Sequence, residues 1–147
     1  MALTDIDTAR ALVLDRVRPT GREIVALRAA EGRVLAREAS SRVDVPGFDN
    51  SAMDGFAGRS GDVAGAGPLA PRELRVIDES RAGRPATAEL GPGDAIAIST
   101  GAMLPAGADT VVRVEDTEAG GAKVAVLAAA DPGANVRRAA EDVRAGD

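Results

Sequence analysis

The sequence of 147 residues contains no cysteine and no histidine. Without cysteine the chain has no disulfide framework and no thiolate zinc site. Without histidine it cannot form the Ser-His or Cys-His pairs that activate a nucleophile. Acid–base chemistry would therefore depend on carboxylates. Any bound metal would take oxygen ligands, which favours a hard cation such as Mg²⁺.

Aromatic residues are nearly absent as well. Phe48 and Phe56 are the only two, whereas hydrophobic residues as a whole make up 45%. This composition is globular, and its core must be built from valine, leucine, isoleucine and alanine. The net charge of −5 argues against a nucleic-acid surface. No apolar run is long enough to span a membrane and no secretory signal is visible, so we expect a cytoplasmic protein without a membrane partner.

Residues 1–43 have the pattern of a helical and linker segment. Thr4, with Asp7 three positions later, resembles a helix N-cap with its acidic partner. Apolar residues at helical spacing follow it. The expected elements are a helix, a short strand and a second helix, over Asp5–Val17, Glu23–Leu27 and Ala29–Ala39.

Residues 44–142 have a different texture, with glycine, proline and short β-branched runs. Gly120-Gly121, between two alternating runs, is typical of a β-hairpin turn. We therefore expect a mainly β chain with N-terminal helices, an α+β class. Residues 143–147 form an exit segment, which suggests that the chain is a piece of something longer. The predicted strands are Glu73–Asp78, Ala95–Ser99, Thr110–Asp116 and Ala122–Ala128.

The stretch Val45–Gly58 (VPGFDNSAMDGFAG) concentrates the unusual residues, including both phenylalanines. Asp49 and Asp54 can ligate a hard cation or transfer a proton. Asn50 and Ser51 can turn the chain and donate hydrogen bonds, and Gly55 lets the backbone approach a ligand closely. The alternative is a surface turn held by side-chain-to-backbone bonds, with apolar residues anchored in the core.

Two further segments carry polar groups. Ser99 and Thr100 end a predicted strand before a glycine, where hydroxyls and free N–H groups can hold an oxyanion. Arg137 and Arg138 can bind phosphate, with Glu141 and Asp142 positioning them or taking a metal. Taken alone, each segment is better explained as structure: a strand terminus with a hydroxyl-rich turn, and a solvated turn with local ion pairs.

The three segments together, in this order, resemble the N-terminal half of the MoeA family of molybdopterin molybdenumtransferases. The resemblance rests on VPGFDNSAMDGFA, ISTGAMLPAGADTVVRVEDT and NVRRAAEDVRAGD, and it covers nearly the whole chain. It implies an irregular, bifurcated or barrel-like β domain. One departure is Ala140, which stands where the family often has glycine.

The resemblance also implies an activity: insertion of molybdate into adenylylated molybdopterin with release of AMP, assisted by Mg²⁺. Asp54, Thr100 and Asp142 match functional residues of the family, so we expect Asp54 and Thr100 to lie close together on one rim, with Asp142 on the same face. The family's site lies in a homodimer, between this region of one subunit and the pterin-binding domain of the other, so the chain would supply one wall of a site. The flanking candidates for substrate binding are Asp49, Asn50, Ser51, Ser99, Arg137 and Arg138; the metal ligands are not identified.

Two other classes of function compete with this one. A non-catalytic interaction or scaffold module could use the same fold, and an acidic β domain could bind Mg²⁺ and nothing more. A module without catalysis would be expected to lose the polar residues of DNSAMDG, STG and RRAAED. All three segments are intact, which favours the enzyme.

Overall fold

A computed structural model describes residues 4–147, which divide into two compact units, one ending at Ala39 and the other spanning Ser40–Asp147. In the first unit, helix α1 runs over Ile6–Arg16. Its N-cap is Asp5, not the predicted Thr4, because the Asp5 carboxylate accepts hydrogen bonds from the backbone N–H and the hydroxyl of Thr8. The helix itself confirms the prediction to within one residue at each end.

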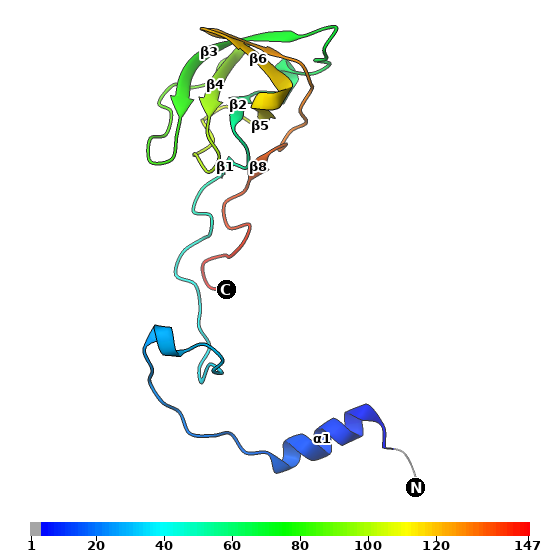
Figure 1. Ribbon diagram of the computed structural model, residues 1–147, viewed down its shortest axis with the longest axis vertical. Helices are drawn as coiled ribbons and strands as arrows, with labels where there is room; N and C mark the ends of the chain where they lie inside the picture. The colour runs from blue at the N-terminus through cyan, green and yellow to red at the C-terminus, as the bar shows by residue number, and fades with distance from the viewer. Residues whose placement is uncertain (1–3) are drawn as a thin grey trace. The chain divides into compact units, whose positions relative to one another are not determined.

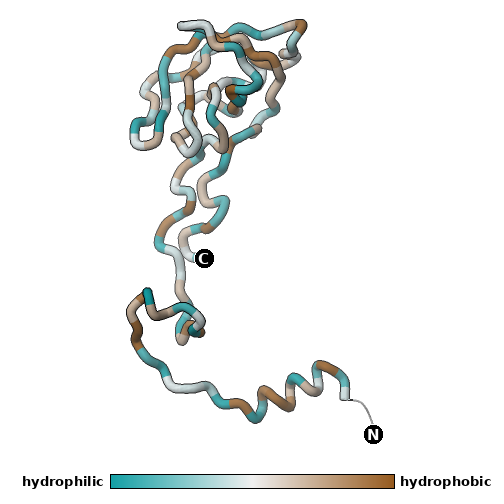
Figure 2. The backbone as a smooth tube through the Cα atoms, viewed as in Figure 1, coloured by the Kyte–Doolittle hydropathy of each residue, from teal (hydrophilic) through white to brown (hydrophobic). Residues whose placement is uncertain are grey.

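The rest of this unit differs from the prediction. Neither the strand expected over Glu23–Leu27 nor the helix expected over Ala29–Ala39 forms; only a short 3₁₀ helix, η1, occupies Leu27–Ala29. Gly32 adopts a positive φ of 74°, a conformation that ends a right-handed helix. No described residue up to Ala39 is buried, and apolar residues are scattered along the unit (Figure 2). Without an apolar face to bury, neither predicted element gains tertiary support.

The second unit contains a six-stranded sheet in the order β5-β2-β4-β3-β7-β6 (Figure 1). All neighbouring pairs are antiparallel except β3 and β4. The outer strands β5 and β6 are consecutive in the chain and are joined only by the 3₁₀ helix η3 (Val114–Asp116), so the sheet must curl on itself. A mainly β fold with a curled sheet is the predicted class. The sheet comprises β2 (Gly55–Gly58), β3 (Arg72–Ser80), β4 (Asp94–Ile98), β5 (Thr110–Arg113), β6 (Thr117–Gly120) and β7 (Lys123–Val126).

The predicted strands are largely confirmed, with one division. The run expected over Thr110–Asp116 is β5 followed by η3. The predicted hairpin is the β6–β7 pair, in which Gly120 is the last strand residue and lies opposite Lys123. Gly121, in the loop, adopts a positive φ of 66°, as a tight hairpin turn requires.

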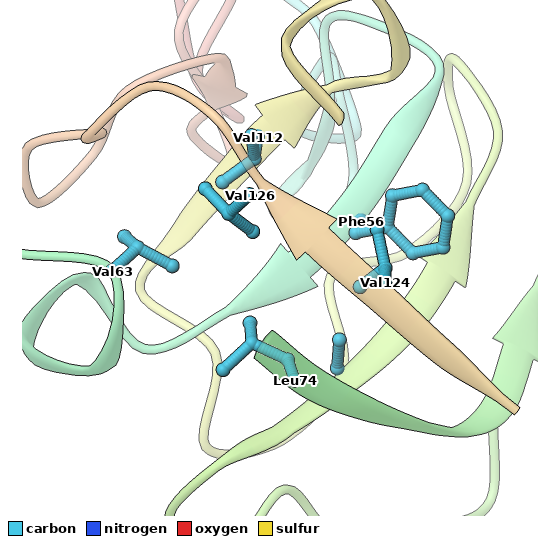
Figure 3. Packing of buried hydrophobic residues seen from close by; sticks show 7 residues of the cluster. Phe56, Val63, Leu74, Val112, Val124 and Val126 are labelled. Atoms are coloured by element: carbon cyan, nitrogen blue, oxygen red, sulfur yellow. The ribbon is translucent and has the colours of Figure 1, made fainter. Parts of the chain in front are cut away.

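The core has two apolar clusters because strand residues alternate between the faces of the sheet. On β2, Phe56 joins the first cluster and Ala57 the second; on β5, Val112 and Val111 divide in the same way. Figure 3 shows Phe56, Val63, Leu74, Val112, Val124 and Val126 packed in the first cluster. Both faces of β2 are therefore covered, and this fixes the position of the residues just before it.

A small second sheet joins β1 (Asn50–Ser51) to β8 (Val136–Arg137). Beyond it, the segment leading into the β domain and the exit segment run antiparallel (Figure 1). The Val45 N–H donates to the Val143 carbonyl at 2.8 Å, and the Ser41 N–H donates to the Asp147 carbonyl at 2.7 Å. Both ends of the β domain therefore leave it together.

Candidate functional site

Strand register alone brings Asp54 to Thr100. Gly55 lies opposite Ile98 in the antiparallel β2–β4 pair, so the residue before β2 meets the residues after β4. The Asp54 Oδ1 accepts a hydrogen bond from the Thr100 backbone N–H at 2.8 Å and another from the Thr100 Oγ1 at 3.2 Å. Both residues are exposed. The expected proximity of these two side chains is confirmed, and we call them the Asp54–Thr100 pair.

Gly55 fixes the backbone of this pair. A Cβ at this position would lie 2.0 Å from the Val112 carbonyl oxygen and 3.0 Å from the Arg113 Cα. The sequence suggested that Gly55 allows the backbone to approach a ligand; the structure shows instead that it allows β5 to approach β2. The Val114 N–H then donates to the Asp54 carbonyl at 3.0 Å. Asp54 is therefore held by β5 on one side and by the end of β4 on the other.

A second group of charges surrounds the small β1–β8 sheet. Asn50 lies opposite Arg137, which places Asp49 beside Arg138. The Arg138 Nη1 lies 2.7 Å from the Asp49 Oδ2, and the Ala139 N–H donates to the Asp49 Oδ1 at 2.8 Å. We call Asp49, Arg137, Arg138, Glu141 and Asp142 the arginine cluster.

Within this cluster Arg137 makes two ion pairs. Its Nη2 lies 2.5 Å from the Asp142 Oδ2, and its Nε lies 3.7 Å from the Glu141 Oε1. The hydrogen bond and charge of Asp142 raise the pKa of Arg137 above its usual value. The Ala139 N–H, followed by Arg138, lowers the pKa of Asp49. Both arginine side chains are partly exposed and paired with carboxylates, so an anion reaching them would compete with those carboxylates.

The segment Asp49–Asp54 lies between the two other predicted segments. On one side the Gly101 N–H donates to the Ser51 carbonyl at 2.8 Å, and the Leu104 N–H donates to the Asp49 carbonyl at 2.9 Å. On the other side the Ala52 N–H donates to the Asn135 carbonyl at 2.9 Å. The segments that contain Gly101 and Asn135 both bond to the loop Asp49–Asp54, so three segments far apart in the sequence meet at this loop.

Asp142 is linked to this arrangement less directly. Its carboxylate contacts Arg137, and its N–H donates to the Val45 carbonyl at 3.0 Å. Across residues 4–147 it has no hydrogen bond or ion pair with Asp54 or Thr100. The structure therefore joins Asp54 to Thr100, and Asp142 to Arg137.

Other predicted residues have structural contacts. The Asn50 and Ser51 side chains are buried, with the Asn50 Nδ2 donating to the Phe48 carbonyl at 3.2 Å and the Ser51 Oγ donating to the Met53 carbonyl at 2.5 Å. These bonds match the structural alternative for the loop. Ser99 is half-buried, and its N–H donates to the Ser80 carbonyl at 3.1 Å. These side chains shape the rim on which the charged groups stand.

Sequence reasoning missed Asn135 and noted Ala140 only as a departure from the family, although both shape the site. Asn135 adopts a positive φ of 55° and donates from its Nδ2 to the Val111 carbonyl at 2.8 Å. Ala140 also adopts a positive φ, of 60°, while its N–H donates to the Pro46 carbonyl at 2.9 Å. Two features of the sequence indicate these positive φ angles. Asparagine tolerates a positive φ better than most residues, and the family often has glycine where Ala140 stands.

The described residues were expected to offer oxygen ligands to Mg²⁺, but their carboxylates do not cluster. Within residues 4–147, no three carboxylates gather closely enough to hold a metal ion. Mg²⁺ is commonly bound by only one or two carboxylates, with water and substrate phosphates as the other ligands. The described residues therefore form no carboxylate cage, and a Mg²⁺ ion here would depend on one or two carboxylates together with water and substrate phosphates. In the same range no helix is long and apolar enough to cross a membrane.

The described residues form a curled β domain with a polar rim. Comparison with known proteins shows to which family this domain belongs. The chain matches the family described as the MoeA N-terminal region (domain I and II) over residues 4–147. It is 44% identical over 122 residues to molybdopterin molybdenumtransferase 2 of Mycobacterium tuberculosis, covering 83% of this chain and 30% of that protein. It is also 44% identical over 124 residues to the molybdopterin molybdenumtransferase of Nostoc sp., covering 84% of this chain and 28% of the relative.

A solved structure supports the same assignment. The molybdopterin biosynthesis MoeA protein of Pyrococcus horikoshii OT3 aligns with a TM-score of 0.82 and 39% identity, over 99% of this chain and 39% of its own. The chain belongs to the MoeA family, in the N-terminal region of that family. It spans 28–30% of the length of the two curated relatives.

Proposed function

We propose that this chain supplies one wall of the active site of a molybdopterin molybdenumtransferase, which inserts molybdate into adenylylated molybdopterin and releases AMP. The observation that carries the proposal is the Asp54–Thr100 pair: an exposed carboxylate held by two hydrogen bonds at a rim where three segments converge. The family membership supports it.

In this proposal Asp54, Thr100 and Asp142 are the catalytic residues. Asp54 uses its Oδ1 to hold Thr100, and its Oδ2 has no donor among residues 4–147. That second oxygen is available to accept a proton or a hydrogen bond from the substrate. Holding Oδ1 fixes the orientation of Oδ2, because both oxygens belong to one planar group. Preorganisation of this kind removes the need to reorient the carboxylate during the reaction.

Arg137 and Arg138 would bind an anionic part of the substrate, either its phosphates or molybdate. Asp49 and Asp142 hold the two guanidinium groups in place at 2.7 and 2.5 Å. Ser99, Asn50 and Ser51 contribute to this rim, the last two mainly through the backbone that their side chains shape. Mg²⁺ belongs to the proposal as a cation that arrives with the substrate phosphates, since residues 4–147 gather no three carboxylates at one place.

The family resemblance extends the proposal to the complete enzyme: a homodimer in the cytoplasm, with the pterin held by a family domain other than the N-terminal region that this chain matches. The 147-residue chain alone should therefore release no AMP from adenylylated molybdopterin in the presence of molybdate and Mg²⁺. One wall cannot bind and orient the substrate. AMP release at substoichiometric chain would contradict this division of the site.

A chimera tests the function itself. The N-terminal region of molybdopterin molybdenumtransferase 2 of Mycobacterium tuberculosis, which is 44% identical over 122 residues, is replaced by this chain. We expect the purified chimera to form molybdenum cofactor and release AMP. A chimera that folds and dimerises like its parent but has no activity would favour the scaffold module instead.

A further inference from the structure

A small pocket next to the rim has no role in the arrangement described so far. Its volume is ≈ 250 Å³, and its lining includes Phe48, Arg81, Pro85, Gly101 and Met103. Phe48 and Met103 are 43% and 40% exposed, although the chain has only two aromatic residues in all. Apolar side chains displayed together in a concave site are typical of ligand recognition.

The walls of this pocket are held by buried polar side chains. Ser80 is fully buried, and its Oγ donates to the Met103 carbonyl at 2.8 Å. Asn50 is also buried; its Nδ2 donates to the Phe48 carbonyl, and its backbone bridges to Met103. The backbones that carry Phe48 and Met103 are therefore fixed to each other and to the end of β3, so the pocket is formed before any ligand arrives.

The remaining wall is a tight turn carrying a cation. The Arg81 N–H donates to the Arg84 carbonyl at 2.9 Å, the Arg84 N–H donates back at 2.9 Å, and Gly83 adopts a positive φ of 76°. The Arg81 Nε lies 2.7 Å from the Glu79 Oε1. An ion pair uses the edge of a guanidinium group, whereas stacking on a ring uses its face. Phe48, Met103 and Arg81 thus offer a ring, a thioether and a guanidinium group to one small space.

The pocket is continuous in sequence with both parts of the rim. Gly101 follows Thr100, and Phe48 precedes Asp49. The volume is below the roughly 300–1,000 Å³ of pockets that enclose a whole drug-sized ligand, so it suits a single ring system. Phosphates attached to that ring would lie on the side of the arginine cluster, where the charge is complementary.

We propose that this pocket binds the fused bicyclic heteroaromatic end of an anionic ligand, stacked on Phe48, while the anionic tail extends toward the rim. The choice of ring rests on the proposed function: there the pterin is held by another domain, so the adenine of adenylylated molybdopterin is the ring of this chemistry left for the pocket. Apolar walls recognise the flat faces of adenine, and the Arg81 guanidinium adds a cation beside them.

The test uses proton NMR on the 147-residue chain, where only two phenylalanine rings contribute aromatic side-chain signals. Phe56 is 9% exposed in the core and serves as the internal reference. AMP and pterin-6-carboxylate are added separately, with ribose 5-phosphate as the ring-free control. We expect nuclear Overhauser contacts between the adenine of AMP and Phe48, with no change at Phe56 and no contacts from the pterin.

Two variants sharpen the result. Phe48→Ala should weaken binding of AMP by about tenfold or more, since stacking on an aromatic residue typically contributes that much. Val114→Ala is the matched control, because Val114 is also exposed, at 48%, but does not line the pocket. Unchanged Phe56 signals in both variants establish that the fold is intact.

The proposal is overturned if the adenine of AMP does not contact Phe48 at millimolar concentration, or if pterin-6-carboxylate or ribose 5-phosphate perturbs Phe48 equally. It is also overturned if Phe48 signals shift with protein concentration alone, since a second copy would then occupy the pocket. An active chimera with no ring contact refutes the pocket but not the proposed function. Ring binding with an inactive chimera refutes the function but not the pocket.

Discussion

Replacing Gly55 with alanine should both destabilise the β domain and displace Asp54. The new Cβ would lie 2.0 Å from the Val112 oxygen, 2.9 Å from the Val112 carbonyl carbon and 3.0 Å from the Arg113 Cα. All three are backbone atoms, so no side chain can rotate away. Relief requires β2 and β5 to separate where Gly55 pairs with Arg113. Overpacking typically costs about 1–3 kcal/mol, and a backbone clash belongs at or above the upper end, so we expect a loss of about 3 kcal/mol.

The assay is urea unfolding followed by far-UV circular dichroism and by the Phe56 ring signals. A loss of that size should lower the urea midpoint by roughly 1–2 M. Hydrogen exchange of the Thr100 amide, which donates to Asp54, should also accelerate. The control is Gly61→Ala, because a Cβ there meets nothing within 4 Å. Equal midpoints for the two variants, with Thr100 still protected, would refute the claim that Gly55 positions Asp54.

Three further predictions follow from single residues. Ala140→Gly should raise the free energy of unfolding by about 0.5 kcal/mol, because relief of the left-handed alanine (φ 60°) outweighs the greater flexibility of the unfolded chain. The neighbouring variant Ala139→Gly is the control and should lower the free energy of unfolding in the same urea assay. The N–H groups of Ala88, Glu79 and Thr87 lower the pKa of Asp78 from 3.8 to about 2. Because the pKa of Asp78 is lower in the folded state, its contribution to stability is present above pH 4 and is lost as the pH falls toward about 2. NMR should therefore show the carboxyl of Asp78 titrating below pH 3. Asp78→Asn should make the free energy of unfolding less dependent on pH between about 4 and 2. Thr100→Val keeps the backbone N–H donor but loses the hydroxyl, so stability should change by no more than about 0.5 kcal/mol while AMP release by the chimera falls; a large loss of stability instead would assign Thr100 to the fold.

The sequence predicts the β domain better than the N-terminal unit, for a physical reason. The strand runs of β3, β4 and β7 carry β-branched and apolar residues that the curled sheet buries, so local pattern and tertiary packing agree. In Ala29–Ala39 the apolar residues Val34 and Leu35 are 94% and 75% exposed, so no packing supports a helix there. Helix α1 forms without a buried residue but has Asp5 as its N-cap, whereas Gly32, with a φ of 74°, interrupts the second predicted helix.

The candidate site likewise has features that the sequence predicted and features that it did not. The convergence of its segments was predicted, and strand register explains how Asp54 reaches Thr100. The pairing of Arg138 with Asp49, 89 residues away, was not predicted, because β1 and β8 are too short for their pairing to be visible in sequence. The close approach that Gly55 permits was foreseen, but its partner β5 was not. Sequence patterns identify which residues are special, whereas the pairing of strands decides what each one contacts.

The most direct test of the central claim is AMP release by the chimera carrying Asp54→Asn. Asparagine keeps an oxygen for the two bonds from Thr100, but it loses the charge that the proposal assigns to the substrate side of the carboxylate. Asp131→Asn is the control, since Asp131 is exposed and its side chain makes no hydrogen bond or ion pair with another residue of the described range. We predict that Asp54→Asn lowers the rate by about 100-fold without changing stability or dimerisation, whereas Asp131→Asn leaves it unchanged. If both variants released AMP at the parental rate, Asp54 would be a structural residue of the rim and the proposed active-site wall would be wrong.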